Sequence, residues 1–222
     1  MIEILYENKN IVAAVKPAGI SSQPDMTGGE DMTALLKNQL KCDIYPVHRL
    51  DKVTGGVMIY AKSKKAAAEY SATDENRLYS KEYFAVISGK PEKSAGKEEN
   101  YLLFDNAAGK SRIYETPVKG AKKAALEYTV TETVCRDGEE YSLLFVRLIT
   151  GRTHQIRAQL SHAGYPVLGD GKYGSKTKCP LALWSHRIKT AAGGAELAFA
   201  KYPPDIFPWN IFDVINKKEM KK

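Results

Sequence analysis

A series of consecutive segments with β-strand character constrains this chain more than any other feature. Between residues 81 and 149 four segments are expected to be strands, 81–88, 112–118, 125–134 and 141–149. Successive side chains of a strand point to opposite faces, so the first segment places Tyr83, Ala85 and Ile87 on one face and Phe84 and Val86 on the other. These segments follow one another with turn-prone residues between them, which favours a meander or hairpins and therefore an antiparallel sheet.

The remaining segments add further strands and only short helices. Strands are expected at 2–6, 11–15, 57–61, 181–188 and 196–200, and helices at 33–40, after the N-cap candidate Ser63, and from Thr153 to Gly164. There is no internal repeat and no low-complexity linker. We therefore expect one α+β domain spanning residues 1–222, with a large, mostly antiparallel mixed sheet flanked by helices and loops. The Lys-rich tail, residues 216–222, is expected to be flexible.

The charge balance suggests an anionic partner. The chain carries 33 Lys and Arg against 26 Asp and Glu, a net charge of +7, so nucleic acid is the first candidate. The apolar fraction of 43% excludes disorder for most of the chain. Three widely spaced cysteines without a C-x-x-C pair favour a reducing compartment. No leader and no long apolar run is present, so we expect a cytoplasmic protein without a membrane span.

Two short segments carry candidate chemistry in the first half of the chain. The string H-R-L-D at residues 48–51 precedes a T-G-G turn at 54–56. Such a turn presents Asp51 where solvent can reach it, although an Asp before a turn also serves as a local cap. Tyr83 lies on a predicted strand, where it is either a core aromatic or a phenol with a chemical role.

A third segment, T-G-R-T-H-Q-I-R at residues 150–157, leads from a strand into a helix. Unpaired N–H groups and the helix dipole make such a start a natural anion site. On the helix, His154, Arg157 and Ser161 share one face, while Ile156 and Leu160 can face the core. The four histidines of the chain do not pair with acids or cysteines at metal-ligand spacing, so no metal site is expected.

Taken together, these strings resemble the RluA-type family of RNA pseudouridine synthases. The resemblance rests on H-R-L-D-x-x-T-x-G, K-x-Y-x-A-x-x-x-G at 81–89, T-G-R-T-H-Q-I-R, G-Y-P-V-L-G-D-G-K-Y-G at 164–174 and V-K-P-A-G at 15–19. It covers about residues 2–205 and implies the pseudouridine synthase fold. Two strings depart from the family pattern: T-G-G at 54–56 stands for T-S-G, and L-W-S-H at 183–186 for L-H-A. No S4-type module precedes residue 1, so the catalytic domain is expected to hold its RNA unaided.

The resemblance implies an isomerase that converts uridines in structured RNA to pseudouridine without a cofactor or metal. Asp51 aligns with the family's catalytic aspartate, the expected nucleophile on a flipped-out uridine. Attack at ribose C1′, attack at uracil C6 and glycal formation all remain open. Arg157 aligns with the active-site arginine, expected to pair with that carboxylate, and Tyr83 with the tyrosine that stacks on the base and assists proton removal from C5.

The expected RNA-binding residues surround these three. Arg49 either fills the space left by the flipped base or is a surface arginine paired with an acid. Arg152, His154 and Lys16 are expected to bind phosphates, and His48, counted with them, to shape the Asp51 loop by hydrogen bonding. A further basic stripe is either an RNA contact or a solvated strand edge; its residues are Lys110, Arg112, Lys119, Lys122 and Lys123, opposed by Glu115.

Two alternatives stand beside the isomerase. A non-catalytic RNA-binding protein or RNA-folding chaperone would share the scaffold, but it would have no use for Asp51, Tyr83 and Arg157 together. A hydrolase using Asp51 with His48 or His154 fits the residue types but not the surrounding strings. The expected partner is a stem-loop of ribosomal RNA, transfer RNA or both, bound by a monomer.

Overall fold

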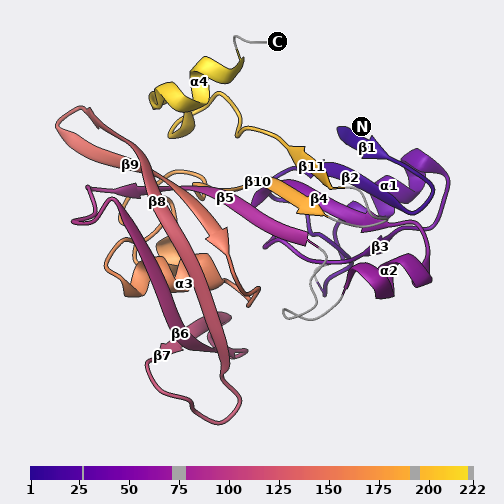
Figure 1. Cartoon of the computed structure of the whole chain (residues 1–222), viewed down its shortest axis with the longest axis horizontal. Helices are drawn as coiled ribbons and strands as arrows, with labels where there is room; N and C mark the ends of the chain where they lie inside the picture. Colours follow the sequence, from indigo (N-terminus) through magenta and orange to yellow (C-terminus); the bar gives the residue numbers. More distant parts are fainter. Residues whose placement is uncertain (27, 72–78, 191–195, 220–222) are drawn as a thin grey trace. The chain divides into compact units, whose positions relative to one another are not determined.

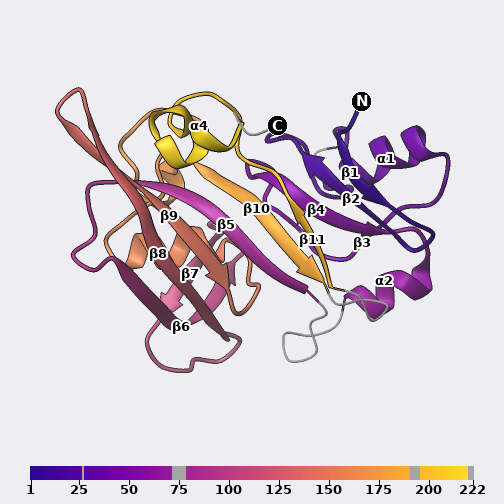
Figure 2. The same cartoon turned by 45° about the horizontal axis from the view of Figure 1, so that its top comes forward.

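The computed structural model describes residues 1–26, 28–71, 79–190 and 196–219, and these residues form two compact units (Figures 1 and 2). The first unit comprises Met1–Lys81 and Trp184–Tyr202, and the second Glu82–Leu183 and Pro203–Lys222. Both units combine a sheet with helices, which confirms the α+β class. The expectation of a single domain spanning the whole chain stays a prediction.

The sheet of the first unit contains β1 (Ile4–Glu7), β2 (Ile11–Lys16), β4 (Gly55–Ala61) and β10 (Leu183–Thr190) in that spatial order. The short strand β3 (Tyr45–Pro46) pairs with β4, and β11 (Leu197–Ala200) with β10. Only the β4–β10 pairing is parallel among the pairings described for this unit. The sheet is therefore mixed and mostly antiparallel, as predicted.

Two capped helices pack in the first unit. Helix α1 (Met32–Leu40) begins after Asp31, whose carboxylate accepts the N–H groups of the first turn. Helix α2 (Lys64–Tyr70) begins after Ser63, whose hydroxyl accepts the N–H of Ala66 at 3.1 Å, so the predicted N-cap is confirmed. A core cluster of this unit joins apolar side chains of β2, one face of β4, α2, β10 and β11, and every residue of β4 is buried.

The sheet of the second unit contains β5 (Tyr79–Ser88), β9 (Glu139–Leu148), β8 (Lys122–Arg136), β6 (Ala95–Asp105) and β7 (Lys110–Tyr114) in that order. The long β8–β9 hairpin turns at Asp137 and Gly138, which both have positive φ. Asp-Gly is a favoured pair for such a two-residue turn, because the primed turn that matches the strand twist needs positive φ at both positions.

Helices complete the second unit. Helix α3 (Gln155–His162) packs against β6 and β7, with Ala158 in a cluster that includes Leu102 and Tyr173. A short 3-10 helix, η2 (Gly171–Tyr173), follows α3, and η4 (Trp209–Ile211) and α4 (Asp213–Glu219) end the unit. None of the helices within the described residues is long and apolar enough to cross a membrane.

Three expectations about the elements need correction or remain open. Strand β6 was not predicted, because charged residues such as Glu98 and Glu99 interrupt its apolar pattern; pairing with β8 along residues 95–102 forms it nonetheless. The strand predicted at 112–118 ends at Tyr114. Helix α4 extends to Glu219, and residues 220–222 lie outside the described residues, so the flexible tail stays a prediction.

Candidate active site

In the first unit, Asp51 lies in the segment that connects β3 to β4. Leu50 is buried and exchanges two hydrogen bonds with the Ser22 hydroxyl: its N–H donates at 3.0 Å, and its C=O accepts at 2.9 Å. The C=O of Asp51 accepts the N–H of Thr54 at 2.9 Å. The backbone is thus fixed on both sides of Asp51, while its side chain stays half-exposed.

The glycines that follow Asp51 are required by the neighbouring strand β10. Gly56 has φ +121°, and a Cβ there would lie 2.2 Å from the carbonyl oxygen of Ser185. A Cβ at Gly55 would lie 2.5 Å from the ring of Trp184, its partner in the parallel pairing. Gly55 therefore leaves room for the Trp184 ring.

Lys16 lies at the end of β2 and is fully buried. Its ammonium donates to the carbonyl oxygens of Pro17 at 3.0 Å, Ile20 at 2.6 Å and Lys52 at 3.1 Å. Burial lowers the pKa of Lys16 to about 8, although the nearby charge of Asp51 acts in the opposite direction. Lys16 thus ties the K-P-A-G turn to the Asp51 loop, with its ammonium directed at carbonyl oxygens. The phosphate contact that was expected for Lys16 stays a prediction.

His48 and Arg49 differ in exposure. His48 is buried, and its Nε2 accepts the N–H of Ile59 at 3.2 Å, which assigns the ring proton to Nδ1. This hydrogen bond joins His48 to β4; the RNA contact and the shaping of the Asp51 loop that were expected for His48 stay predictions. Arg49 is exposed and forms no hydrogen bond or ion pair with the part of the chain that the structure describes. The alternative of a surface arginine paired with an acid is not supported there.

In the second unit, Tyr83 lies on β5, the most deeply buried strand of that sheet. Its side chain is 4% exposed, and the residues from Lys81 to Ile87 are all buried. The strand is held further along by Val86, whose N–H donates to Ala182 at 3.0 Å. Tyr83 is thus a buried aromatic, and the role expected for its ring and phenol in the reaction stays a prediction.

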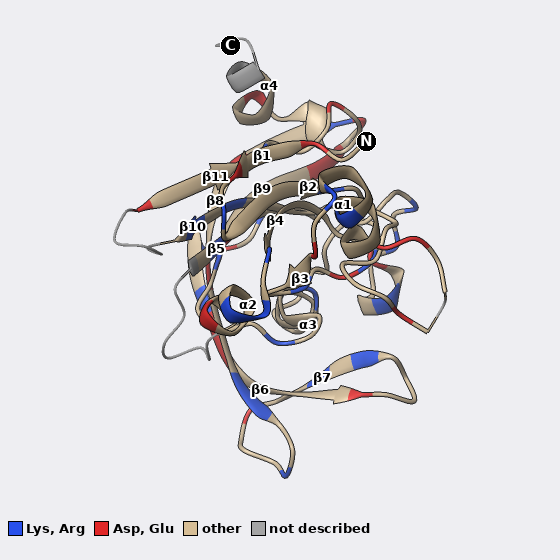
Figure 3. Cartoon of the chain, turned by 90° about the vertical axis from the view of Figure 1, so that its right-hand side faces the viewer, with Lys and Arg blue, Asp and Glu red and all other residues tan. Residues whose placement is uncertain are grey.

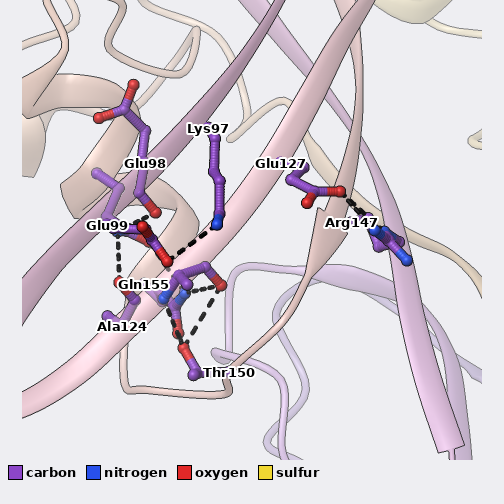
Figure 4. A network of polar contacts seen from close by, with 10 residues as sticks. Lys97, Glu98, Glu99, Ala124, Glu127, Arg147, Thr150 and Gln155 are labelled. Atoms are coloured by element: carbon purple, nitrogen blue, oxygen red, sulfur yellow. Dashed lines mark hydrogen bonds and ion pairs between the residues drawn. The ribbon is translucent and has the colours of Figure 1, made fainter.

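A buried glutamine fixes the T-G-R-T-H-Q turn that precedes α3 (Figure 4). The Oε1 of Gln155 accepts from the Thr150 hydroxyl at 2.8 Å and from the N–H of Arg152 at 2.9 Å. Its amide nitrogen donates to the carbonyl of Ala125 at 3.0 Å and to Gln159 at 2.9 Å. All four hydrogen-bonding positions of the amide are used, so Gln155 holds the turn against β8.

The network continues from Gln159 to β6 and the protein surface. Gln159 donates to the Asn100 side chain at 2.9 Å, and Asn100 in turn donates to Glu115 at 3.4 Å. Glu115 also pairs with His162, the last residue of α3, at 2.6 Å. Sequence reasoning missed this network, although the two glutamines at a spacing of four residues place both amides on one helix face.

Arg157 pairs with Asp170, an acid to which the sequence analysis assigned no role. Its Nε donates to Oδ2 of Asp170 at 2.6 Å and its Nη2 to Oδ1 at 2.9 Å, and both side chains are buried. The Arg157 guanidinium also lies 5.1 Å from the centre of the Tyr173 ring. Both partners belong to the G-D-G-K-Y string at 169–173, which contributed to the resemblance but did not indicate this pairing.

The two remaining predicted residues lie at the start of α3. His154 has φ +54°, and its Nδ1 is 3.0 Å from the Tyr173 hydroxyl. Its ring meets Phe104 edge to face at 5.6 Å between centroids. Arg152 is half-exposed and donates through Nε to the carbonyl of Lys123 at 2.9 Å. Both side chains are thus held in place at the helix terminus, as an anion site requires.

The basic stripe lies on β7, on the beginning of β8 and between them. Basic positions are drawn blue on the ribbon in Figure 3. All five basic side chains of the stripe are exposed. Arg112 forms a surface ion pair with Asp105 at 2.7 Å, and Glu115 is engaged by His162. Most of the positive charge is therefore contributed by lysines; these are Lys110, Lys119, Lys122 and Lys123.

The structure thus places the predicted residues in two groups. The first unit carries His48, Arg49 and Asp51 on one loop that Lys16 supports. The second unit carries Tyr83 on β5 and three residues at the start of α3; these are Arg152, His154 and Arg157. The first group contains the half-exposed carboxylate of Asp51, and the second contains the buried guanidinium of Arg157, which pairs with Asp170.

Comparison with known proteins identifies the family. The chain matches the family described as RNA pseudouridylate synthase over residues 10–162. It is 32% identical over 188 residues to the ribosomal large subunit pseudouridine synthase C of Rickettsia conorii, covering 82% of this chain and 59% of that protein. It is 30% identical over 182 residues to the tRNA pseudouridine synthase C of Vibrio cholerae, covering 78% and 75%. The chain spans about three fifths of the length of the first of these relatives.

Solved structures support the same assignment. Human RNA Pseudouridylate Synthase Domain Containing 4 is 26% identical, with a TM-score of 0.73 over 91% of this chain and 88% of that one. Human RNA Pseudouridylate Synthase Domain Containing 1 shares the fold, with a TM-score of 0.76 at 20% identity. The chain belongs to the RNA pseudouridylate synthase family and to its RluA type.

Proposed function

We propose that this protein isomerises specific uridines to pseudouridine in stem-loops of ribosomal or transfer RNA, acting as a cytoplasmic monomer without a cofactor. The observation that carries the proposal is the family match across residues 10–162, which includes Asp51, Tyr83 and Arg157. The names of the relatives support both RNA classes, since one acts on the large ribosomal subunit and another on tRNA.

Each of the three residues has an assigned part in this proposal. The reaction breaks the bond between ribose C1′ and uracil N1 and forms a bond between C1′ and C5. The C5 proton is released to solvent and N1 takes up a proton, so the product is an isomer of uridine. Asp51 acts as the nucleophile on a flipped-out uridine, because a carboxylate can form a covalent bond and then leave again. Tyr83 stacks on the uracil and assists removal of the C5 proton, and Arg157 supplies positive charge for the anionic groups of the reaction.

The exposed basic residues would hold the RNA. Arg49, next to the nucleophile, fills the space that the flipped uridine leaves or grips the adjacent phosphate. Arg152, His154 and the lysines of the basic stripe contact phosphates, which position RNA without reading much sequence. Lys16 and His48 are not assigned a phosphate, because the hydrogen bonds described for them engage backbone groups, those of the K-P-A-G turn and the Asp51 loop for Lys16 and that of Ile59 for His48.

Tritium release tests the proposal. Purified protein is mixed with RNA labelled at uracil C5 and extracted from cells that lack the gene, with chelator present and no nucleotide added. We expect tritium release by the wild type and none by Asp51→Asn. Asp43→Asn, an exposed acid of the same unit that is paired with Lys37, is the matched control and should react as the wild type does. Full turnover by Asp51→Asn would contradict the assigned nucleophile.

The same experiment separates the non-catalytic alternative. If the protein were an RNA-binding protein or chaperone, the wild type and Asp51→Asn would both retain the labelled RNA on a filter, and neither would release tritium. A synthase instead releases tritium only with the wild type, while both proteins bind RNA equally. Tyr83→Phe keeps the ring and removes the hydroxyl, so a loss of tritium release with unchanged binding would assign the phenol to proton removal.

A further inference from the structure

The second unit contains a buried carboxylate to which the reaction as described assigns no role. Asp170 is 3% exposed and lies in the turn between α3 and η2. A buried carboxylate requires a partner of opposite charge or several hydrogen bonds, because burial disfavours its ionised form. The carboxylate of Asp170 meets that requirement with the guanidinium of Arg157.

The geometry of this pair fixes the orientation of the guanidinium. Asp170 receives Nε and Nη2 of Arg157 at 2.6 and 2.9 Å, along one edge of the planar group. A bidentate contact of this type sets the plane and the direction of an arginine, whereas a single hydrogen bond would not. Nη1 is not part of the pair and lies toward the other edge of the guanidinium.

The Asp170 backbone is itself held in place. Its C=O accepts the N–H groups of Tyr173 and Ser175, both at 3.0 Å, and its N–H donates to the carbonyl of Val167 at 3.0 Å. The preceding Gly169 has φ +78°, and a Cβ there would lie 2.5 Å from the carbonyl oxygen of Cys179. Only glycine therefore fits directly before Asp170 at this turn.

Tyr173 joins the pair to the helix start. Its ring lies beside the guanidinium of Arg157, and its hydroxyl accepts the N–H of Ser111 at 2.7 Å and contacts Nδ1 of His154 at 3.0 Å. The Ser161 hydroxyl of α3 donates to the carbonyl of Tyr173 at 2.6 Å. The turn 170–173 thus contacts α3 at its N-cap His154, at Arg157 and at Ser161. These contacts hold the pair of Arg157 and Asp170 in place.

We propose that Asp170 is a positioning residue for the uridine isomerisation, which acts by holding and charge-balancing the guanidinium of Arg157. This inference rests on the proposed function, because it assigns Asp170 to the same reaction. Asp170 itself contacts neither RNA nor the reacting atoms. Its replacement therefore lowers the rate of the chemical step and leaves RNA binding nearly unchanged.

The test compares kcat and KM for a transcript that carries a uridine mapped as a substrate of the wild type. Asp170→Asn is nearly isosteric but cannot accept two charge-assisted hydrogen bonds. We expect kcat to fall at least about a hundredfold, with KM changed less than about threefold. The matched control is Glu127→Gln, which removes the carboxylate from the exposed pair with Arg147 (Figure 4) and should leave kcat unchanged.

A double-variant cycle distinguishes positioning from a general loss of structure. If Asp170 acts through Arg157, the double variant Asp170→Asn with Arg157→Ala is as slow as Arg157→Ala alone. Multiplied losses, or a wild-type kcat for Asp170→Asn, would overturn the inference. Should Asp170→Asn fail to fold, as judged by circular dichroism, Asp170→Glu keeps the charge with altered geometry and is expected to fold with a reduced kcat. A wild-type kcat in Asp170→Glu would then refute the positioning role, and wild-type protein without activity would instead refute the proposed function.

Discussion

The buried ammonium of Lys16 predicts how the stability of the protein depends on pH. The folded protein releases the Lys16 proton near pH 8, whereas a lysine in the unfolded chain keeps it up to its ordinary pKa of 10.5. Between these values the unfolded chain binds more protons, so the free energy of unfolding rises with pH. For the two pKa values the rise amounts to about 1.3 kcal/mol between pH 7 and pH 9. The destabilising effect of the buried charge is complete below pH 8 and disappears above 10.5.

Lys16→Met removes this titration and keeps the apolar length of the side chain. The assay is urea unfolding at pH 7, 8 and 9, and the quantity of interest is the wild-type free energy of unfolding minus that of the variant. We expect this difference to rise by about 1.3 kcal/mol across the range. Lys9→Met, an exposed lysine of the same unit, is the control, and its curve should run parallel to the wild type. A flat difference for Lys16→Met would refute the account of its surroundings.

Three further predictions concern single elements. Gly56→Ala should lower the free energy of unfolding by at least ~3 kcal/mol in the same urea assay, because the added Cβ would overlap the backbone of β10. Gly138→Ala is the control: Gly138 also has positive φ but has open space around it, so the loss should be about 1 kcal/mol. Gln155→Leu should destabilise the protein by about 3 kcal/mol, since it leaves several buried hydrogen-bonding groups without their partner; a loss below about 1 kcal/mol would show that the network of Figure 4 is dispensable. Replacing Lys122 and Lys123 by Ala should make the RNA-binding constant less dependent on salt. In a plot of its logarithm against the logarithm of the salt concentration, the slope should become less steep by roughly 0.7–0.9 for each RNA phosphate that these lysines neutralise. An unchanged slope would exclude these two lysines from RNA binding.

Local patterns were enough to predict most of the secondary structure. The strand patterns at 81–88, 125–134 and 141–149 and the N-cap at Ser63 depend on residues close together in sequence, and the structure confirms them as β5, β8, β9 and the start of α2. Strand β6 escaped prediction, because it is stabilised by its long pairing with β8 rather than by its own apolar pattern. Local propensity is a weak guide where pairing with a distant strand decides the conformation.

The sequence motifs identified the residues of the candidate site but did not predict their burial or their hydrogen-bond partners. Lys16 was expected to bind a phosphate, yet its ammonium donates to three backbone carbonyls from two separate turns. Similarly, the acid in the G-D-G-K-Y turn gave no sign of its pairing with Arg157, thirteen residues earlier. Burial and long-range pairing depend on how the elements pack, and a linear pattern does not contain that information.

The central claim is that the protein converts uridines to pseudouridine through Asp51. Its most direct test is to map pseudouridines in total RNA from three strains: one with the gene deleted, one with the deletion complemented by the wild type, and one complemented by Asp51→Asn. The account predicts that defined uridines of ribosomal or transfer RNA lose their modification in the deletion strain and regain it only with the wild type. Restoration by Asp51→Asn, or an identical map in all three strains, would contradict it.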